Sequence, residues 1–374
     1  MTKSQANATG NLQVDIISDA GVARSLQDEW TGLATQSSAA PFALPAFALA
    51  WWEHLGRGRL HVVTVRERSG RLVGVAPFHV RRLGGLDMVR WLGHGLGAVG
   101  ELLIGVTKGD VASTIWDNID PEGRAVLHLL EYRHGGAGLM ELRQGDWRAR
   151  SQLHEICPII DLRGVANATE LLDHPDRRGL RKQLTRVDRH MERDGAKVSI
   201  SIAETPSQVR DALPAVEAVY DAAEAANPRQ HLLRGPYRPF LIAALDDAAR
   251  RGHLALLVAE IDGEPAAFDI HLGIGNTASA WLGRHHPDVA PRSPGHLLLR
   301  AGVDWATAAG YDRFDLQLGA DQYKMRWASG TYDTVSVIAA RTSARLSRAR
   351  GTIAAVEVGF TTRARLPRRR PAVT

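Results

Sequence analysis

The sequence of 374 residues has a single cysteine and no uninterrupted apolar run as long as a membrane span. One cysteine excludes an intrachain disulfide and a metal cluster built from cysteines. The polar first ten residues lack the apolar segment of a secretory signal. We therefore expect a cytoplasmic protein in which Cys157, within an apolar Ile-Cys-Pro-Ile-Ile run, is a buried inert thiol rather than a nucleophile.

Lysine is also scarce, because 41 of the 46 basic residues are arginine. The net charge of +5 is unevenly placed: residues 341–374 carry +8, which leaves −3 for residues 1–340. The basic balance thus comes from the tail and is weak evidence for a nucleic-acid partner. A hydrophobic content of 44% and a charged content of 23% are ordinary for a globular protein, and the length leaves room for two domains.

The most informative stretch is residues 313–327, Arg-Phe-Asp-Leu-Gln-Leu-Gly-Ala-Asp-Gln-Tyr-Lys-Met-Arg-Trp. Its first half alternates apolar and polar residues, which predicts a short strand that carries Asp315 and ends at Gly319. A helix is expected to start near Asp321. Upstream, Ser293 is a candidate N-cap for a helix with Pro294 at its first position.

This order of loop, helix, acidic strand and polar turn has a chemical interpretation. A helix N-terminus offers free N–H groups and a positive dipole to a phosphate. Asp315 on the next strand is placed to take a proton from an amine, and Tyr323 to return one to a leaving group. The alternative is structural: a capped turn, a paired acid and an aromatic residue at a boundary.

The same residues, with Ser-Pro-Gly-His-Leu-Leu at 293–298, resemble the GNAT acyltransferase superfamily, and more narrowly its CelD-like (cellulose-biosynthesis-associated) subfamily related to the Fem peptidyltransferases. The resemblance implies an α/β fold of two tandem GNAT-like domains, each a central mixed sheet flanked by helices. It implies a non-catalytic domain at 1–160, a catalytic acyl-CoA domain at 161–345 and a basic tail at 346–374.

The resemblance also implies the chemistry, an N-acyltransferase that moves an acyl group from acyl-CoA (acetyl-CoA or longer) to a small-molecule or glycan-linked amine, without a metal. Asp315 and Tyr323 would be catalytic. The implied cofactor-binding residues are Arg292, Ser293, Gly295 and His296, and the implied substrate-binding residues are Lys324, Arg326 and Arg181.

Two other functions stay open. One is a Fem-like peptidyltransferase that uses aminoacyl-tRNA, and the other is a GNAT-fold scaffold without catalysis. The predicted helix at 173–194 has leucines on one face and arginines in its first half, so it is either a substrate-phosphate surface or a solvated face. Asp269 and His271, two apart on a strand, are alternative base candidates or a satisfied buried pair. His285 and His286 lack the spacing of metal ligands.

Fewer features mark the first half. Residues 124–150 resemble the C-terminal stretch and are interpreted as a degenerate internal repeat of it. In this repeat Glu141 is on a short strand and Trp147 takes the place of Tyr323. Chance similarity is an alternative. A helix is predicted from Pro45 to Leu55. Its aromatic residues favour core packing over a substrate-side cluster.

Overall fold

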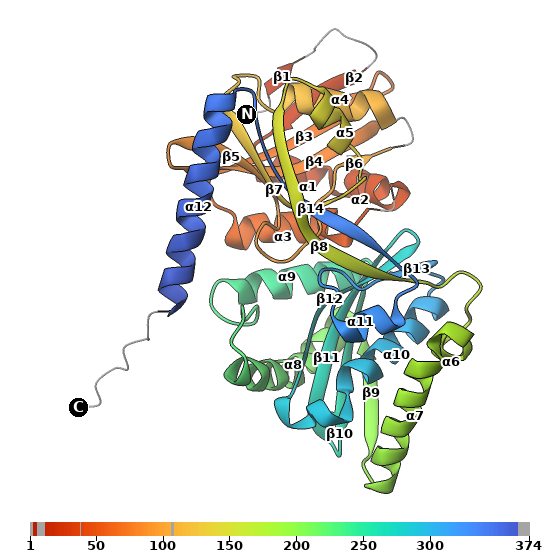
Figure 1. Cartoon of the computed structure of the whole chain (residues 1–374). Coiled ribbons are helices and arrows are strands. Elements are labelled where there is room, and N and C mark those ends of the chain that lie inside the picture. Colours follow the sequence, from red (N-terminus) through yellow and green to blue (C-terminus); the bar gives the residue numbers. More distant parts are fainter. Residues whose placement is uncertain (1–2, 6–11, 38, 106–107, 366–374) are drawn as a thin grey trace.

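The computed structural model describes residues 3–5, 12–37, 39–105 and 108–365. In these residues every strand belongs to one sheet, with the order β1-β2-β3-β4-β5-β7-β14-β8-β13-β12-β11-β10-β9 and β6 paired to β4. Most neighbours are antiparallel, but β5 and β7 run parallel, as do β12 and β13. Figure 1 shows this sheet passing through an upper and a lower half, with helices packed around it. The predicted mixed α/β fold is confirmed.

The N-terminal half alternates strands with short helices. Its elements are β1 (Lys3–Gln5), β2 (Leu12–Ile17), α1 (Ala20–Ser25), α2 (Gln27–Gln36), η1 (Pro41–Ala43), α3 (Pro45–Leu55), β3 (Arg59–Glu67), β4 (Leu72–Leu83), β5 (Leu86–Trp91), β6 (Leu103–Ile104), α4 (Lys108–Asn118), β7 (Ala125–Arg133), α5 (Leu139–Gln144) and β8 (Arg148–Asp161).

The C-terminal half repeats much of this order with longer helices. Its elements are α6 (Ala168–Asp173), η2 (Pro175–Arg177), α7 (Arg178–Arg193), β9 (Val198–Ala203), α8 (Pro206–Ala226), α9 (Tyr237–Arg250), β10 (Leu254–Ile261), β11 (Glu264–Ile274), β12 (Thr277–His285), η3 (Pro287–Arg292), α10 (Pro294–Ala308), β13 (Arg313–Asp315), α11 (Gln322–Trp327), β14 (Gly330–Ala340) and α12 (Ser343–Arg365).

Two long strands join the halves. β14, from the end of the chain, lies between β7 and β8, and β8 in turn pairs with β13 through Ile159, Ile160 and Asp161. β8 therefore spans the boundary predicted at residue 160, and β14 completes the sheet of the N-terminal half. The predicted domain limits stay a prediction, because the backbone hydrogen bonds run through them.

Several local predictions are confirmed. Helix α3 spans the predicted residues, and α10 begins at Pro294 as predicted. The turn between β10 and β11 consists of Asp262 and Gly263, both at positive φ. Thr205 caps α8 through a reciprocal capping box with Gln208, which explains where that helix begins. Cys157 is buried, and burial raises the pKa of its thiol to about 12.

Other local predictions are wrong. The basic helix begins at Arg178 rather than at residue 173, because Pro175 forces the preceding His174 into an extended conformation. Glu141 lies on helix α5, not on a strand, and Trp147 is buried. The predicted tail at 346–374 stays a prediction: residues 346–365 belong to α12, and residues 366–374 lie outside the described residues.

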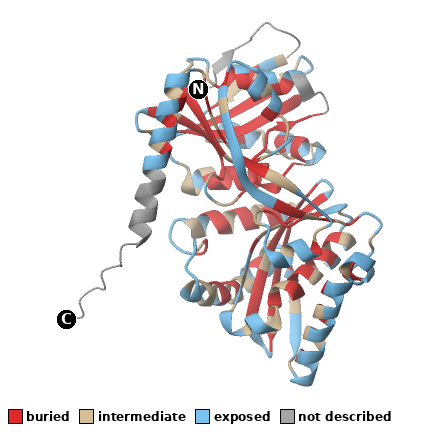
Figure 2. Ribbon diagram, viewed as in Figure 1, coloured by how far each residue is buried: buried red, intermediate tan, exposed pale blue. Residues whose placement is uncertain are grey.

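Aromatic packing ties α3 of the first half to α9 and β12 of the second. Phe47 meets Phe240 at 5.4 Å and Trp281 at 5.2 Å between ring centroids, both edge to face. Phe47 and Phe240 are buried, so the aromatic residues of α3 serve the core, as predicted. Figure 2 shows the buried residues continuing from one half into the other. None of the described helices has the length and apolar character needed to cross a membrane.

Candidate active site

A notch opens in the sheet where β12 and β13 separate. The two parallel strands are paired only from Thr277 to Ser279 on β12. Beyond Asp315 the chain stays on β8, because the N–H groups of Leu316 and Gly319 donate to carbonyls of that strand. β12 continues in the other direction, paired with β11 alone. The separated strand ends leave room for a ligand between them.

The N-terminus of α10 faces this notch. Pro294 is its first residue, as predicted, but Ser293 does not cap it: that residue has φ 52 and ψ 50, and its side chain makes no cap hydrogen bond. A helix leaves its first N–H groups without intrahelical partners, and its dipole makes this end positive. The uncapped end of α10 is therefore suited to an anion.

The notch and this helix end border one cavity of about 810 Å³. It receives apolar residues from β12 and from the segment after β13, and polar residues from several loops. Its lining consists of Ala223, Ala226, Asn227, Arg229, Ala267, Phe268, Asp269, Ala280, Trp281, Leu282, Gly283, Arg284, His285, Pro287, Ala290, Ser293, Pro294, Gly295, His296, Leu298, Leu299, Leu316, Leu318, Asp321, Gln322, Tyr323 and Lys324.

Asp269 supplies a carboxylate to the cavity wall. Its side chain is 19% exposed, and the facing residue on β12 is Gly283, where a Cβ would come within 2.7 Å of an Asp269 oxygen. Behind it, His271 is fully buried with Nε2 3.1 Å from Asp269 Oδ2, and Gly302 of α10 leaves space for its ring. The glycines on both neighbouring elements make room for this acid–histidine pair, and only Asp269 reaches the cavity.

Tyr323 and His296 lie together at another part of the lining. Their rings meet edge to face at 6.0 Å, and Trp327 Nε1 donates to His296 Nδ1 at 2.9 Å. That bond assigns the His296 hydrogen to Nε2. Tyr323 is 43% exposed as a whole, but desolvation of its hydroxyl, followed by the charges of Asp269 and Asp321, raises its pKa above the ordinary value. The Tyr323 hydroxyl is therefore protonated at neutral pH and can donate.

Asp315, the predicted base, is absent from the described lining of the cavity. It is 1% exposed, and its carboxylate accepts hydrogen bonds from Tyr332 Oη and from the N–H of Gln317, each at 2.8 Å. Arg133 of β7 lies 3.6 Å from it and also binds Glu101. Burial raises the pKa of Asp315, and Arg133 opposes that shift. Asp315 is a paired acid at the junction of the halves. This is the structural alternative to its predicted role as a base in the cavity.

Three of the four predicted phosphate-binding residues lie at the cavity, and one does not. Ser293, Gly295 and His296 line the cavity. Arg292 is outside the described lining, with Nη1 3.7 Å from Asp262 Oδ2. Sequence reasoning did not single out Arg229, an exposed residue of the lining whose charge acts on Tyr323. It lies in a loop of turn residues, where no periodicity marks a side chain that returns to a cavity.

The structure does not bring the three predicted substrate-binding residues together. Lys324 lines the cavity, but its Nζ donates to the Leu318 carbonyl at 2.7 Å and so fixes the segment after β13. Arg326 is hydrogen-bonded to Gln183 of α7 and lines a separate groove. Arg181 is on α7, with Nη1 2.6 Å from Asp173 Oδ1.

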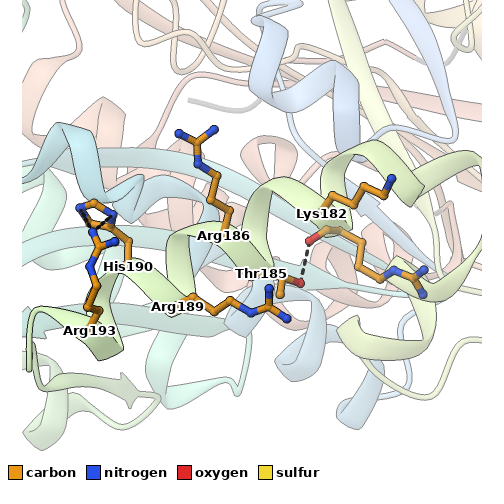
Figure 3. A pocket seen from close by; sticks show the side chains of 7 residues that line it. Lys182, Thr185, Arg186, Arg189, His190 and Arg193 are labelled. Atoms are coloured by element: carbon orange, nitrogen blue, oxygen red, sulfur yellow. Dashed lines mark hydrogen bonds between the residues drawn. The ribbon is translucent and has the colours of Figure 1, made fainter.

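The exposed face of α7 forms a cationic groove of about 530 Å³. Figure 2 shows this helix exposed along most of its length, and Figure 3 shows its basic side chains spreading from a single helix. Within the described part of the chain Lys182, Arg186 and Arg189 have no carboxylate partner. The lining consists of Arg181, Lys182, Thr185, Arg186, Arg189, His190 and Arg193.

Comparisons with known proteins agree with this architecture. Residues 178–325 match the model of the acetyltransferase (GNAT) domain. No curated protein sequence matches the chain. Among solved structures, FemX is similar with a TM-score of 0.58 at 11% identity, over 84% of this chain and 95% of that one.

Two further structures share the fold. A conserved protein of unknown function from Bacteroides thetaiotaomicron has a TM-score of 0.56 at 12% identity, over 87% of this chain and 99% of that one. L-PGS from Bacillus licheniformis has a TM-score of 0.51 at 13% identity, over 85% and 92%. At these identities the likeness is one of fold.

Proposed function

Since residues 178–325 form a GNAT-type domain, we propose that the protein is an N-acyltransferase that moves an acyl group from acyl-CoA to an amine. One observation carries the proposal: a single cavity brings together an uncapped helix N-terminus, the carboxylate of Asp269 and the hydroxyl of Tyr323. The lining of this cavity thus contains a binding position for an anionic donor, a base and a proton donor.

The donor would bind in the notch with its pyrophosphate at the N-terminus of α10. Backbone N–H groups there and the guanidinium of Arg229 would neutralise the phosphates. The thioester would then lie between β12 and the segment after β13. Trp281, Leu316 and Leu318 supply apolar surface for an acyl chain at this place.

The acceptor would be an amine attracted by the acids of the lining. Asp269 takes a proton from the amine nitrogen as the nitrogen attacks the thioester carbonyl. The C–N bond forms, the C–S bond breaks, and the leaving thiolate takes a proton from Tyr323 Oη. Asp269 releases the amine proton to solvent and Tyr323 takes one back from solvent, so the products are an amide and free CoA. Asp269 therefore replaces Asp315 as the proposed base.

The test is mass spectrometry of thiol release and product when the full chain is given a panel of acyl-CoAs and amines. We expect amide formation that Asp269→Asn abolishes and that Tyr323→Phe slows. Asp288→Asn is the matched control, since that side chain is 87% exposed on η3. Failure of every acyl-CoA to bind or react would contradict the proposal.

The cationic groove of α7 favours a second candidate, a Fem-like transferase with aminoacyl-tRNA as donor. Arginines without acidic partners on an exposed helix suit contacts to a phosphate backbone. RNA retention that falls steeply with salt, and that Arg186→Gln with Arg189→Gln removes, would favour this donor. Absence of both acyl-CoA and RNA binding would favour a non-catalytic scaffold.

A further inference from the structure

Three adjacent strands of the N-terminal half place basic side chains in a row. His79 of β4 is directly opposite Arg90 of β5. The parallel register of β5 and β7 aligns Val89 with Leu127, and so sets Arg90 beside His128 on the same face of the sheet. His94, in the loop after β5, lies with its ring 5.3 Å from that of His128. We call His79, Arg90, His94 and His128 the arginine–histidine cluster.

Three members of the cluster are buried, and His94 is partly buried. Arg90 is 8% exposed, His79 2% and His128 5%. Trp51 of α3 covers one end, with its ring 4.9 Å from that of His79. On the same side the carbonyl of Arg57 accepts a hydrogen bond from His79 Nδ1 at 3.3 Å.

No acid accompanies this burial among the described residues. The charged neighbour that acts on Arg90 is another cation, Arg81, and together with burial it lowers the pKa of Arg90 to about 10. Elsewhere in the protein the partly buried arginine Arg133 has two carboxylates, Glu101 and Asp315. A buried guanidinium without a counter-charge is strongly unfavourable unless another anion is supplied.

Unpartnered nitrogen atoms gather at the same place. Arg90 Nε, His79 Nε2, His94 Nδ1 and His128 Nδ1 are all buried without a hydrogen-bond partner in the described part of the chain. A neutral imidazole has one N–H, and His79 uses it at Nδ1 on the Arg57 carbonyl. The donors left for a ligand are therefore Arg90, through its planar guanidinium, and the N–H groups of His94 and His128. The group that satisfies several such donors at once, and balances the arginine, is an oxyanion.

We propose that the arginine–histidine cluster binds a small tetrahedral oxyanion, inorganic phosphate or a single phosphate group, with Arg90 as the counter-charge and His94 and His128 as neutral donors. The burial of Arg90 and His128 favours a ligand as small as this. The site is in the opposite half of the protein from the cavity at α10, and it does not depend on the proposed acyl transfer.

The experiment is thermal unfolding of the full chain with and without about 10 mM inorganic phosphate, at an ionic strength held constant with sodium chloride. We expect phosphate to raise the Tm of the wild type by about 2 °C or more. The variant Arg90→Met, close to arginine in length, should lose this rise. Without phosphate it should be as stable as the wild type or more stable, because it removes an uncompensated buried charge.

Arg82→Met is the matched control, because Arg82 is an exposed arginine of the neighbouring strand β4, opposite Asp87 and on the other face of the sheet from Arg90. It should keep the full phosphate response. An equal rise of the Tm in wild type and Arg90→Met would overturn the proposal. A wild-type Tm that does not change with phosphate, together with a lower Tm of Arg90→Met, would also overturn it, because ordered water would then suffice as the partner of Arg90. Tighter calorimetric binding of glycerol phosphate than of inorganic phosphate would assign the site to a phosphate group on a larger molecule, and the reverse order would assign it to the free ion.

Discussion

The two halves of the protein use the same arrangement with opposite results. In each, the last strand of an antiparallel meander pairs in parallel with the strand that follows the next helix: β5 with β7, and β12 with β13, over three residue pairs. A non-glycine residue at positive φ lies inside β7, near its end, and another follows β13: Glu131 at 52° and Gln317 at 57°. The backbone geometry that opens the notch is thus present twice.

What fills the notch differs. In the N-terminal half the chain after β5 folds back, and Gly100 bridges to Tyr132 of β7. Trp91 packs so closely that a Cβ on Gly100 would lie 2.3 Å from its Nε1, and the rings of Trp91 and Tyr132 meet at 5.3 Å. In the C-terminal half the corresponding space is the cavity at α10. The comparison teaches that the fold supplies the position, and that the side chains and the returning loop decide whether a ligand can enter.

Low pH should produce the largest difference in stability between the two halves. Burial lowers the pKa of His61, His79 and His128, all in the N-terminal half, to about 4 each. The unfolded chain therefore binds protons that the folded chain does not, and stability falls as pH falls from about 6.5 to about 4. Each histidine contributes up to about 3 kcal/mol of this loss.

The measurement is hydrogen exchange of strand amides at pH 7 and at pH 4.5. Protection in β3, β4 and β7 should fall before protection in β10 and β11. The variant His79→Gln should weaken the dependence of unfolding free energy on pH, because it removes one of the three groups. Uniform loss of protection in both halves, with an unchanged slope in the variant, would break the comparison.

The junction of the halves should be the next most sensitive place. Arg133 of β7 is the shared counter-charge of Glu101 and Asp315. Arg133→Met leaves two buried carboxylates without their counter-charge and should lower the free energy of unfolding by about 3–5 kcal/mol. Urea denaturation measures this. Tyr332→Phe, which removes one hydrogen bond to Asp315, should cost about 1–3 kcal/mol.

Adding Asp315→Asn to the Arg133 variant should restore part of the loss, because one of the two stranded charges is gone. If the double variant is no better than the single one, Arg133 acts through packing rather than through charge.

The open notch should be most sensitive at Asp269. Asp269→Asn keeps the size of the side chain and removes the base, so kcat should fall by about 100-fold or more, with little change in the affinity for acyl-CoA. Steady-state kinetics with the best acyl-CoA and amine pair measures both. Asp315→Asn should act on stability, because its carboxylate is sealed among Arg133, Tyr332 and Gln317. Loss of kcat in Asp315→Asn, with an unchanged kcat in Asp269→Asn, would mean that Asp315 is the base.

Much of the fold followed from local sequence, but the site did not. Pro45 and Pro294 act within a few residues, so the first residues of their helices were predicted correctly. The state of Asp315 depends on Arg133, which is distant in sequence and comes from the other half. Local alternation placed Asp315 on a strand without indicating that β8 and β14 would bury it.

Asp269 is the converse case. Its strand was predicted and it was considered as a base beside His271, but its access to the cavity depends on Gly283 of the neighbouring strand and on the separation of β12 from β13. Neither has a sequence signal that a single chain reveals. The residues that decide between a filled and an open notch belong to tertiary packing.

The smallest expected effect concerns the helix end at the notch, where stability and binding should move in opposite directions. A Cβ on Gly295 would meet no atom within 4 Å, so the site tolerates a side chain. Gly295→Asp adds a negative charge to the first turn of α10, which the helix dipole favours, so the Tm should be unchanged or slightly higher. The same charge repels an anionic donor and should weaken acyl-CoA binding about 10-fold, or about 1.4 kcal/mol. Gly295→Ala, which adds the Cβ without the charge, should bind acyl-CoA like the wild type in a calorimetric titration. Equal affinities for all three proteins would mean that the pyrophosphate does not lie at this helix end, and the open notch would then need another ligand.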